Sequence, residues 1–336
     1  HTLCAEGADQ FGGGTKTFPW NGAACPVQAA KDKVDAGFEF MQKMGIEYYC
    51  FHDIDLCEEA ATVEEYEANL KEVVAKVKDA DVVIFAGGIS PAVEGEEMPV
   101  SIPGFKGGDR TTIELPEIQT NLLRELKKAG KRVVFVNYSG SALALAREAE
   151  LCDAILQAWY PGQAGGTAVA DVLLGNYTPA GRLPITFYKN DSQLPDFEDY
   201  KMAGRTYRYF NGEPLFKFGH GLSYTTFEFS KPKYDNKSGK VSVTVKNAGK
   251  MDGEEVVQVY LRNTADAEGP IKTLRAYKRI MLKAGEKQTV EIDFPRSSFE
   301  CWDASTNTMR VMSGTYEIMV GNSSDDACLT KFNVKI

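Results

Sequence analysis

The sequence predicts an α/β sandwich domain, a mostly parallel sheet with helices on both faces, followed by an all-β sandwich of the immunoglobulin or fibronectin type III kind. Up to about residue 185, helix-like and strand-like segments alternate, which is typical of βαβ units. From about residue 240, short segments alternate apolar and polar residues between turn signals, as in an antiparallel β-sandwich. The 336 residues, 43% of them hydrophobic, are enough for two cores.

The first half carries regular start and stop signals. Gly45 and Gly130 each follow an amphipathic segment and predict a helix end. Thr62 followed by Glu65 predicts a capping box at the start of the helix 63–80. The expected strands are 46–56, 81–88, 131–140 and 152–162, and the expected helices are 26–44, 63–80, 115–130, 141–150 and 165–175.

The rhythm changes after about residue 185, where the chain becomes aromatic and rich in proline and glycine. A structureless stretch of that length is usually functional or a wrapping linker. The expected sandwich strands are 240–249, 254–263, 275–285, 287–294 and 314–322. We therefore divide the chain into an irregular segment 1–25, an α/β domain 26–187, an aromatic linker 188–224 and a β-sandwich 225–336.

Composition excludes several classes of partner. The net charge is −9 and no long Lys/Arg run is present, so we expect neither nucleic acid nor an anionic membrane as a partner. The apolar runs are strand-sized and too short to span a bilayer. Seven scattered cysteines without a CxxC pair favour reduced thiols and a cytoplasmic location. A periplasmic location stays open, because the chain starts at His1 and an upstream segment can have been removed.

Four runs from residue 81 onward carry a resemblance to a known family: "GGISPAVEGEEMPVSIPGFKGGDRTTIELPEIQ", "AWYPGQAGGTAVADVLLGNYTPAGRLPITF", "GRTYRYFNGEPLFKFGHGLSYTTFEF" and "VTVKNAGKMDGEEVVQVYL". They cover about three quarters of the chain and resemble, in the family's order, the C-terminal half of glycoside hydrolase family 3 enzymes, the β-xylosidases and β-glucosidases. The resemblance implies an α/β sandwich followed by a fibronectin type III-like domain. The first of these runs looks closest to the β-xylosidase branch.

Residues 1–76 are similar to a different family. "HTLCAEGADQFGGGTKTFPWN", "AKDKVDAGFEFMQKMGIEYYCFHDIDL" and "EEYEANLKEVV" resemble the early part of xylose isomerase, a metal-dependent barrel enzyme. The resemblance changes from one family to the other inside the helix 63–80. The chain therefore looks like a fusion in which whole helices and strands of one protein replace those of another. We expect 26–80 to replace the first βα units of the family 3 domain, because the exchange keeps the strand–helix–strand order.

The family 3 resemblance implies a general acid/base glutamate in the loop after the strand 81–88. Glu94 and Glu96 are the candidates there, and the "EG" context favours Glu94. A carboxylic acid held against sugar and apolar walls is suited to donate a proton. The alternative is that these acids only form a solvated loop.

Five further residues are candidates for substrate binding: Asp109, Arg110, Trp159, Arg205 and Tyr207. Aromatic faces and guanidinium groups suit sugar recognition. For each residue a structural role is the alternative. Asp109 and Arg110 would brace their loop by an ion pair, and Trp159 would pack in a corner of the fold. Arg205 and Tyr207, in "GRTYRYF", would brace the two domains. His220 is also expected to be structural.

In xylose isomerase, the residues matching His52 and Asp55 form a polar pair that handles the sugar ring. The chain leaves that family before its metal ligands, and one histidine with Asp53 and Asp55 cannot complete a metal site. We therefore expect the pair to be vestigial scaffold, with no bound metal and no cofactor.

Three functions follow in order. The first is a β-xylosidase-type hydrolase acting on a xylo-oligosaccharide or another β-glycoside. The family's nucleophile comes from a barrel that we do not find in this sequence, so it requires a partner that supplies the barrel, or a carboxylate such as Asp53 or Asp55. The second is a non-catalytic carbohydrate-binding or scaffold protein, which can form a homo-oligomer. Xylose isomerase activity is the third and weakest.

Overall fold

The computed structural model describes residues 8–9, 12–13, 18–44, 50–51, 62–75, 79–91, 93–94 and 98–336. The chain divides into two compact units, residues 1–162 and 163–336. Residues 163–187, which the sequence assigns to the α/β domain, therefore fall in the second unit. The finer division into four segments stays a prediction.

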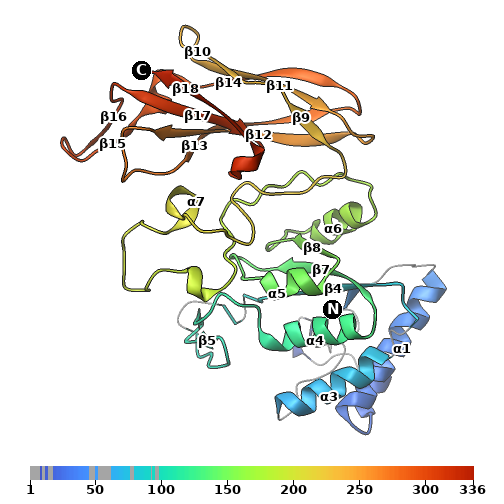
Figure 1. Cartoon of the computed structure of the whole chain (residues 1–336). Helices are drawn as coiled ribbons and strands as arrows, with labels where there is room; N and C mark the ends of the chain where they lie inside the picture. The colour runs from blue at the N-terminus through green and yellow to red at the C-terminus, as the bar shows by residue number, and fades with distance from the viewer. Residues whose placement is uncertain are drawn as a thin grey trace. The chain divides into compact units, whose positions relative to one another are not determined.

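The first unit is built on a four-stranded parallel sheet in the order β3–β4–β7–β8 (Figure 1). The strands are β3 (Cys50–Phe51), β4 (Val82–Gly88), β7 (Arg132–Tyr138) and β8 (Ala154–Gln157). Phe85 and Phe135 are fully buried and their rings stack at 5.4 Å. The apolar runs of β4 and β7 form a sheet because burial on both faces needs side chains of this kind.

The helices of this unit are α1 (Pro26–Met44), α3 (Val63–Val74), α4 (Glu117–Lys128) and α5 (Ala146–Leu151). Its short elements are β1 (Ala8–Asp9), β2 (Gly12–Gly13), η1 (Pro19–Gly22), β5 (Phe105–Lys106) and β6 (Asp109–Arg110). At the start of α3, the Glu65 amide donates to Thr62 Oγ1 at 3.2 Å, which confirms the threonine half of the predicted capping box.

The isomerase-like segment is part of this sheet. Cys50 pairs in parallel with Ile84, and Phe51 with Phe85. Lys31 on α1 also forms an ion pair with Glu72 on α3 at 2.8 Å. The predicted joining of the two segments in one sheet is confirmed for the described residues.

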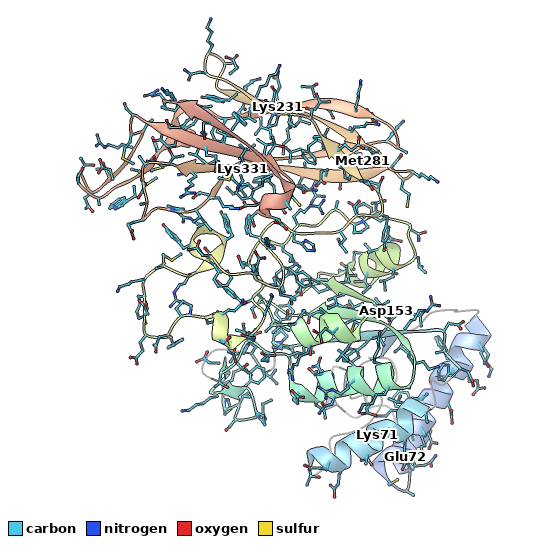
Figure 2. All side chains as sticks on the ribbon, viewed as in Figure 1. Lys71, Glu72, Asp153, Lys231, Met281 and Lys331 are labelled. Carbon is cyan, nitrogen blue, oxygen red and sulfur yellow. The ribbon has the colours of Figure 1, made fainter. Side chains whose placement is uncertain are left out.

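A hollow of about 350 Å³ lies between α3 and α4. Lys71, Val74 and Ala75 line it from the first segment, and Glu125, Ala129 and Lys131 from the second. Lys71 and Glu72 mark this part of α3 in Figure 2. The described side chains at the ends of these two helices thus border an open hollow.

The second unit contains two four-stranded antiparallel sheets, which confirms the predicted β-sandwich (Figure 1). In one sheet β11 pairs with β9, β10 and β14, and the other has the order β13–β12–β17–β18. The strands of the two sheets are β9 (Phe227–Phe229), β10 (Lys233–Asp235), β11 (Lys240–Asn247), β12 (Gly253–Asn263), β13 (Thr273–Leu282), β14 (Lys287–Asp293), β17 (Thr315–Gly321) and β18 (Leu329–Lys335). A separate hairpin consists of β15 (Cys301–Asp303) and β16 (Thr308–Arg310). Two short 3-10 helices are η4 (Arg296–Phe299) and η5 (Asp326–Cys328). Alternate residues of β11 are buried, as a half-exposed strand requires.

The segment before the sandwich contains α6 (Gly165–Leu173), η3 (Asp191–Gln193) and α7 (Thr206–Tyr209). Side-chain bonds tie this segment to the sandwich. The Tyr177 hydroxyl donates to Glu254 at 2.7 Å, and the Thr178 hydroxyl donates to the Asp252 carbonyl at 2.8 Å. These bonds explain why residues 163–187 belong to the unit of the sandwich.

Two sequence predictions of elements were wrong. The helix expected at 141–150 begins only at Ala146, because Ala144 forms a parallel bridge with Glu114 and its amide donates to the Ile113 carbonyl. The strands β9, β10, β15, β16 and β18 were not predicted, because four of them have only three residues and carry little periodicity.

Within the described part of the chain, no helix has the length and apolar character to cross a membrane.

His220 gives the second unit a dependence on pH. Its ring stacks on Phe216 at 5.3 Å, and burial is the main cause that lowers its pKa, with the Arg182 guanidinium adding to it and Asp325 opposing it. As pH falls below about 6.5, the unfolded state takes up the proton first, so the free energy of unfolding should decrease. We expect His220→Phe to remove this slope in urea titrations between about pH 5 and pH 8. An unchanged slope would show that another group carries it.

Candidate active site

The loop that follows β4 is fixed at its first residues. Gly88 has a φ of +127°, and a Cβ there would lie 1.9 Å from the Tyr138 carbonyl oxygen, so only glycine fits. The Gln119 side chain bonds the amide and the carbonyl of Gly88, both at 2.8 Å. The Ile89 amide donates to the Tyr138 carbonyl at 2.9 Å. The loop therefore leaves the carboxyl edge of the sheet in a defined direction.

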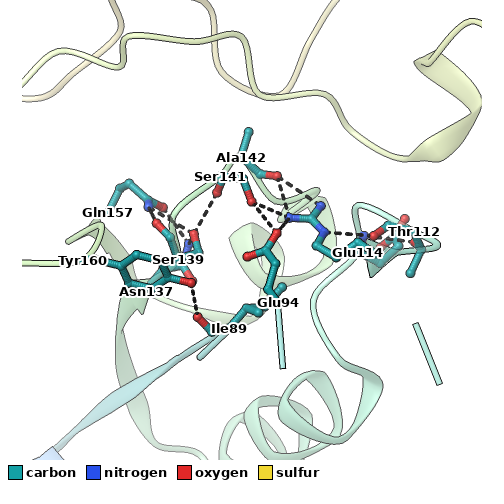
Figure 3. Close-up of polar contacts among 11 residues, drawn as sticks. Ile89, Glu94, Thr112, Glu114, Asn137, Ser139, Ser141, Ala142, Gln157 and Tyr160 are labelled. Carbon is teal, nitrogen blue, oxygen red and sulfur yellow. Dashed lines mark hydrogen bonds and ion pairs between the residues drawn. The ribbon is translucent and has the colours of Figure 1, made fainter. Parts of the chain in front are cut away.

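Glu94 lies on this loop, and two side chains hold one of its oxygens (Figure 3). Ser141 donates its hydroxyl to Glu94 Oε1 at 3.0 Å, and Arg110 Nη1 lies 3.4 Å from the same oxygen. Arg110 Nη1 also donates to Ser141 Oγ at 2.7 Å. The glutamate side chain is 23% exposed. One carboxylate oxygen is thus anchored while the group keeps access to solvent.

Arg110 is itself held in place by backbone oxygens. Its Nε donates to the Thr112 carbonyl at 3.2 Å, and its Nη2 donates to the Ala142 carbonyl at 3.3 Å. These bonds fix the guanidinium plane, because arginine presents its donors in a rigid fork. Arg110 can therefore orient the Glu94 carboxylate, because backbone carbonyls and not the carboxylate fix the position of its guanidinium group.

A buried polar layer supports Ser141 from the ends of β7 and β8. Ser139 Oγ donates to the Ser141 carbonyl at 2.9 Å, and Asn137 Nδ2 donates to Gln157 Oε1 at 2.6 Å. Gln157 Nε2 in turn lies 3.3 Å from Ser139 Oγ. In open α/β sheets, this edge is where ligands bind.

Tyr160 completes the edge from the loop after β8. Its hydroxyl donates to the Ile89 carbonyl at 2.7 Å, and a side chain at Gly140 would meet its ring at 2.6 Å. Burial is the largest cause that raises the pKa of the phenol, and the Glu94 carboxylate adds to it. Tyr160 therefore remains a hydrogen-bond donor that ties this loop to the one carrying Glu94.

Comparison with protein families identifies the chain. The model of the glycosyl hydrolase family 3 C-terminal domain matches residues 3–224, and that of a fibronectin type III-like domain matches residues 255–324. The chain belongs to glycoside hydrolase family 3. Its predicted resemblance to this family is confirmed.

Individual relatives agree with this membership. A xylan 1,4-β-xylosidase of Xylanibacter ruminicola is 54% identical over 81% of this chain and 32% of its own length. A periplasmic β-glucosidase of Salmonella typhimurium is 36% identical over 37% of its length. The crystal structure of a β-glucosidase from Streptomyces venezuelae in complex with D-glucose has a TM-score of 0.70 at 30% identity, over 81% of this chain and 36% of that one. The family 3 chain thus spans about a third of the length of these relatives.

The second resemblance is confirmed as well. A xylose isomerase of Phocaeicola vulgatus is 83% identical to this chain over 78 residues, which are 18% of that protein. The length of the match agrees with the isomerase-like segment 1–76.

Of the predicted catalytic residues, the structure places Glu94 at the sheet edge, while Glu96, His52, Asp53 and Asp55 lie outside the described residues. Among the residues described, no group of three or more His, Cys, Asp or Glu side chains is arranged to hold a metal ion.

The predicted binding residues of the first unit have different positions. Arg110 contacts Glu94, whereas Asp109 is exposed on β6. Trp159 lies in the loop after β8 with a φ of +57° and is partly exposed. Their contact with substrate stays a prediction.

Arg205 and Tyr207 lie in the second unit and make structural contacts. Arg205 donates to the carbonyls of Lys201 at 3.0 Å and Asp196 at 3.2 Å, which closes a loop on itself. The Tyr207 ring stacks on Phe218 at 4.1 Å, and its hydroxyl accepts from the Leu274 amide. These contacts favour the bracing role within this unit.

Sequence reasoning missed Ser141 and Tyr160. Ser141 is 47 residues from Glu94, so no local spacing connects them. The available signal was position, because each residue follows a strand of the parallel sheet and parallel strands end at the same edge.

Proposed function

We propose that this chain carries the acid/base half of a β-xylosidase-type active site, with Glu94 as the acid/base. The observation that carries the proposal is the anchoring of Glu94 Oε1 by Ser141 and Arg110 at the carboxyl edge of the parallel sheet. A family 3 chain with a partly exposed, oriented glutamate in the loop after β4 is equipped for this role.

The arrangement suits proton transfer to a leaving group. In a retaining glycosidase, one carboxylic acid protonates the leaving oxygen and then acts as the base toward water. With Oε1 bound by Ser141 and Arg110, Oε2 is the oxygen that carries the proton in this proposal. Arg110 and Ser141 restrict rotation of the carboxyl group, so that the proton is presented in one direction.

The nucleophile is the second requirement. It must be a carboxylate roughly 5 Å from the first. The hydrogen-bond partners of Glu94 in the described part of the chain are an arginine and a serine, not a carboxylate. We propose that the nucleophile comes from a catalytic barrel matching the part of the relatives that this chain does not cover, in the same protein or in a partner.

The proposed substrate is a terminal β-linked xylose. The 54% identity to the xylan 1,4-β-xylosidase supports this preference over a glucoside. The alternative is non-catalytic binding of carbohydrate, which a chain of one third of the relatives' length also permits. A weaker alternative is an activity related to xylose isomerase.

One experiment separates these functions. The full chain is assayed for release of xylose from xylobiose, whose leaving group needs a proton, alone and after addition of the unmatched part of the Xylanibacter ruminicola relative as a separate polypeptide, and xylobiose binding is titrated on the same preparation. Turnover in either assay that falls in Glu94→Gln supports the proposal. Xylobiose binding without turnover in both assays supports the non-catalytic alternative, and turnover unchanged by Glu94→Gln rejects the assigned role.

Divalent metals should have no effect on this chain. Because the isomerase-like segment ends before that family's metal ligands, Mg²⁺, Mn²⁺ or Co²⁺ should neither raise the melting temperature nor produce xylulose from xylose. A ligand that binds only the folded state must raise the melting temperature by mass action. A saturable rise at micromolar metal would show that His52, Asp53 or Asp55 belongs to a metal site.

A further inference from the structure

The second unit contains a pocket of about 190 Å³ that the proposed chemistry of Glu94 does not use. Its walls come from the segment 186–218, the start of β13 and the loop before β18. The volume is below the range of about 300–1,000 Å³ typical of drug-sized ligands, so it suits one small ring.

One side of the pocket is apolar and aromatic. Tyr207, Phe210 and Phe218 line it, and the stack of Tyr207 on Phe218 keeps two of these rings in fixed orientations. Aromatic rings of this kind present flat apolar surfaces. They suit a ligand with an apolar face, such as the C–H face of a pyranose.

The other side is polar, and its charges balance. Lys217 and Lys272 line the pocket together with Glu213 and Asp326. Lys217 pairs with Asp325 at 3.0 Å and with Glu213 at 3.3 Å. The Lys272 ammonium contacts Asp326 and donates to the Ser324 carbonyl at 2.8 Å, and Lys331 also pairs with Asp326 at 3.2 Å. Three cations beside three carboxylates give no net attraction for an anion or a cation. They offer alternating donors and acceptors, which a neutral polyhydroxylated molecule can bond in pairs.

Thr186 supplies a polar atom without a partner. It is 7% exposed and lines the pocket, and its Oγ1 has no hydrogen-bond partner in the described part of the chain. Buried hydroxyl groups are almost always bonded, so an unbonded one calls for an explanation. This oxygen is shielded from solvent in the structure, so a rotation of the Thr186 side chain would be needed to bring it to the pocket, where a ligand hydroxyl would provide the missing bond.

We propose that this pocket of the second unit binds one neutral polyhydroxylated ring of pentose size, independently of the site at Glu94. The aromatic wall takes the apolar face of the ring, and the lysines, the carboxylates and Thr186 Oγ1 bond its hydroxyls. The proposal does not depend on hydrolysis by this chain.

Two buried threonines make a matched test. Thr178 is also 7% exposed, but its hydroxyl already donates to the Asp252 carbonyl at 2.8 Å. Thr186→Val removes a hydroxyl that has no internal bond, so its melting temperature should stay equal or rise. It should weaken binding of D-xylose about threefold to tenfold, the loss expected for one neutral hydrogen bond. Thr178→Val should show the reverse, a lower melting temperature with unchanged xylose affinity.

The titrations use D-xylose on the full chain and on Glu94→Gln, followed by chemical shifts in NMR spectra. Saturable binding that is kept in Glu94→Gln and weakened in Thr186→Val and in Asn211→Ala, an exposed residue of the pocket wall, supports the proposal. Absence of saturable binding to Glu94→Gln, or binding unchanged in both pocket variants, overturns it. Binding of phosphate or a diamine in place of xylose overturns the neutral ligand class.

Discussion

Replacing Glu94 by glutamine is expected to lower hydrolysis of an alkyl β-xyloside by about 10² to 10⁴-fold, the usual contribution of general-acid catalysis. An alkoxide is a poor leaving group and must receive a proton as the bond breaks. An activated aryl group leaves with little proton transfer, so the bond-breaking step of an aryl xyloside should be affected much less. Initial rates for the two substrates, measured on the preparation that shows turnover, test this difference.

The controls for this prediction are other acids of the chain. Glu96→Gln should be nearly silent if Glu94 is the acid/base, because only one of the two can protonate the leaving oxygen. Glu228→Gln changes an exposed glutamate 3.9 Å from Lys246 in the sandwich and should leave both rates unchanged. His52→Ala should also be nearly silent. If His52→Ala abolishes hydrolysis while both glutamine variants retain it, the chemistry belongs to the isomerase-like segment.

Replacing Arg182 by methionine should be the most damaging single change to stability in the second unit. Arg182 and Glu255 pair at 2.6 Å with side chains only 7% and 1% exposed. Without the arginine, the buried carboxylate keeps bonds from the Val256 amide and from Asn322 but loses its counter-charge. Removing one partner of a buried pair costs about 3–5 kcal/mol of unfolding free energy. For a unit of this size that corresponds to a fall of about 6–20 °C in melting temperature.

Calorimetry of the full chain measures this fall, and two further variants define its origin. Arg182→Met combined with Glu255→Met should cost less than the sum of the two single changes, because it leaves no unpaired buried charge. Lys240→Met removes an ion pair with Glu291 in which both side chains are about half exposed, and it should lower the melting temperature far less, because exposed pairs contribute little. A strictly additive double variant would contradict the assigned coupling.

The elements that the sequence predicted well are those with a clear pattern of apolar residues. The runs of β4 and β7 are apolar throughout because both faces of a parallel sheet are covered, and the observed strands match the predicted ones within two residues. The alternation in β11 and β12 likewise located the sandwich. In these segments, local pattern and final burial agree.

The residues of the candidate active site were harder to predict from the sequence. The family 3 resemblance pointed to Glu94 in the loop after β4, but its partner Ser141 comes from a loop after another strand and carries no motif of its own. Asp109 and Arg110 were expected to brace the loop by an ion pair. In the structure Arg110 pairs with Glu94 and donates to the Thr112 and Ala142 carbonyls, while Asp109 is exposed. Contacts that depend on how strands are ordered in a sheet cannot be read from spacing along one segment.

The hollow between α3 and α4 lies where the two resemblances meet. The side chains of Lys71, Val74 and Ala75 lie in the segment that resembles xylose isomerase, while Glu125 and Ala129 lie beyond it. Helices whose surfaces have been selected together interlock at nearly the density of an organic crystal. The sheet needs only matching strand order and backbone geometry, so it can form between segments whose helix surfaces were not fitted to each other. The hollow is the place where such a mismatch between helix surfaces would remain.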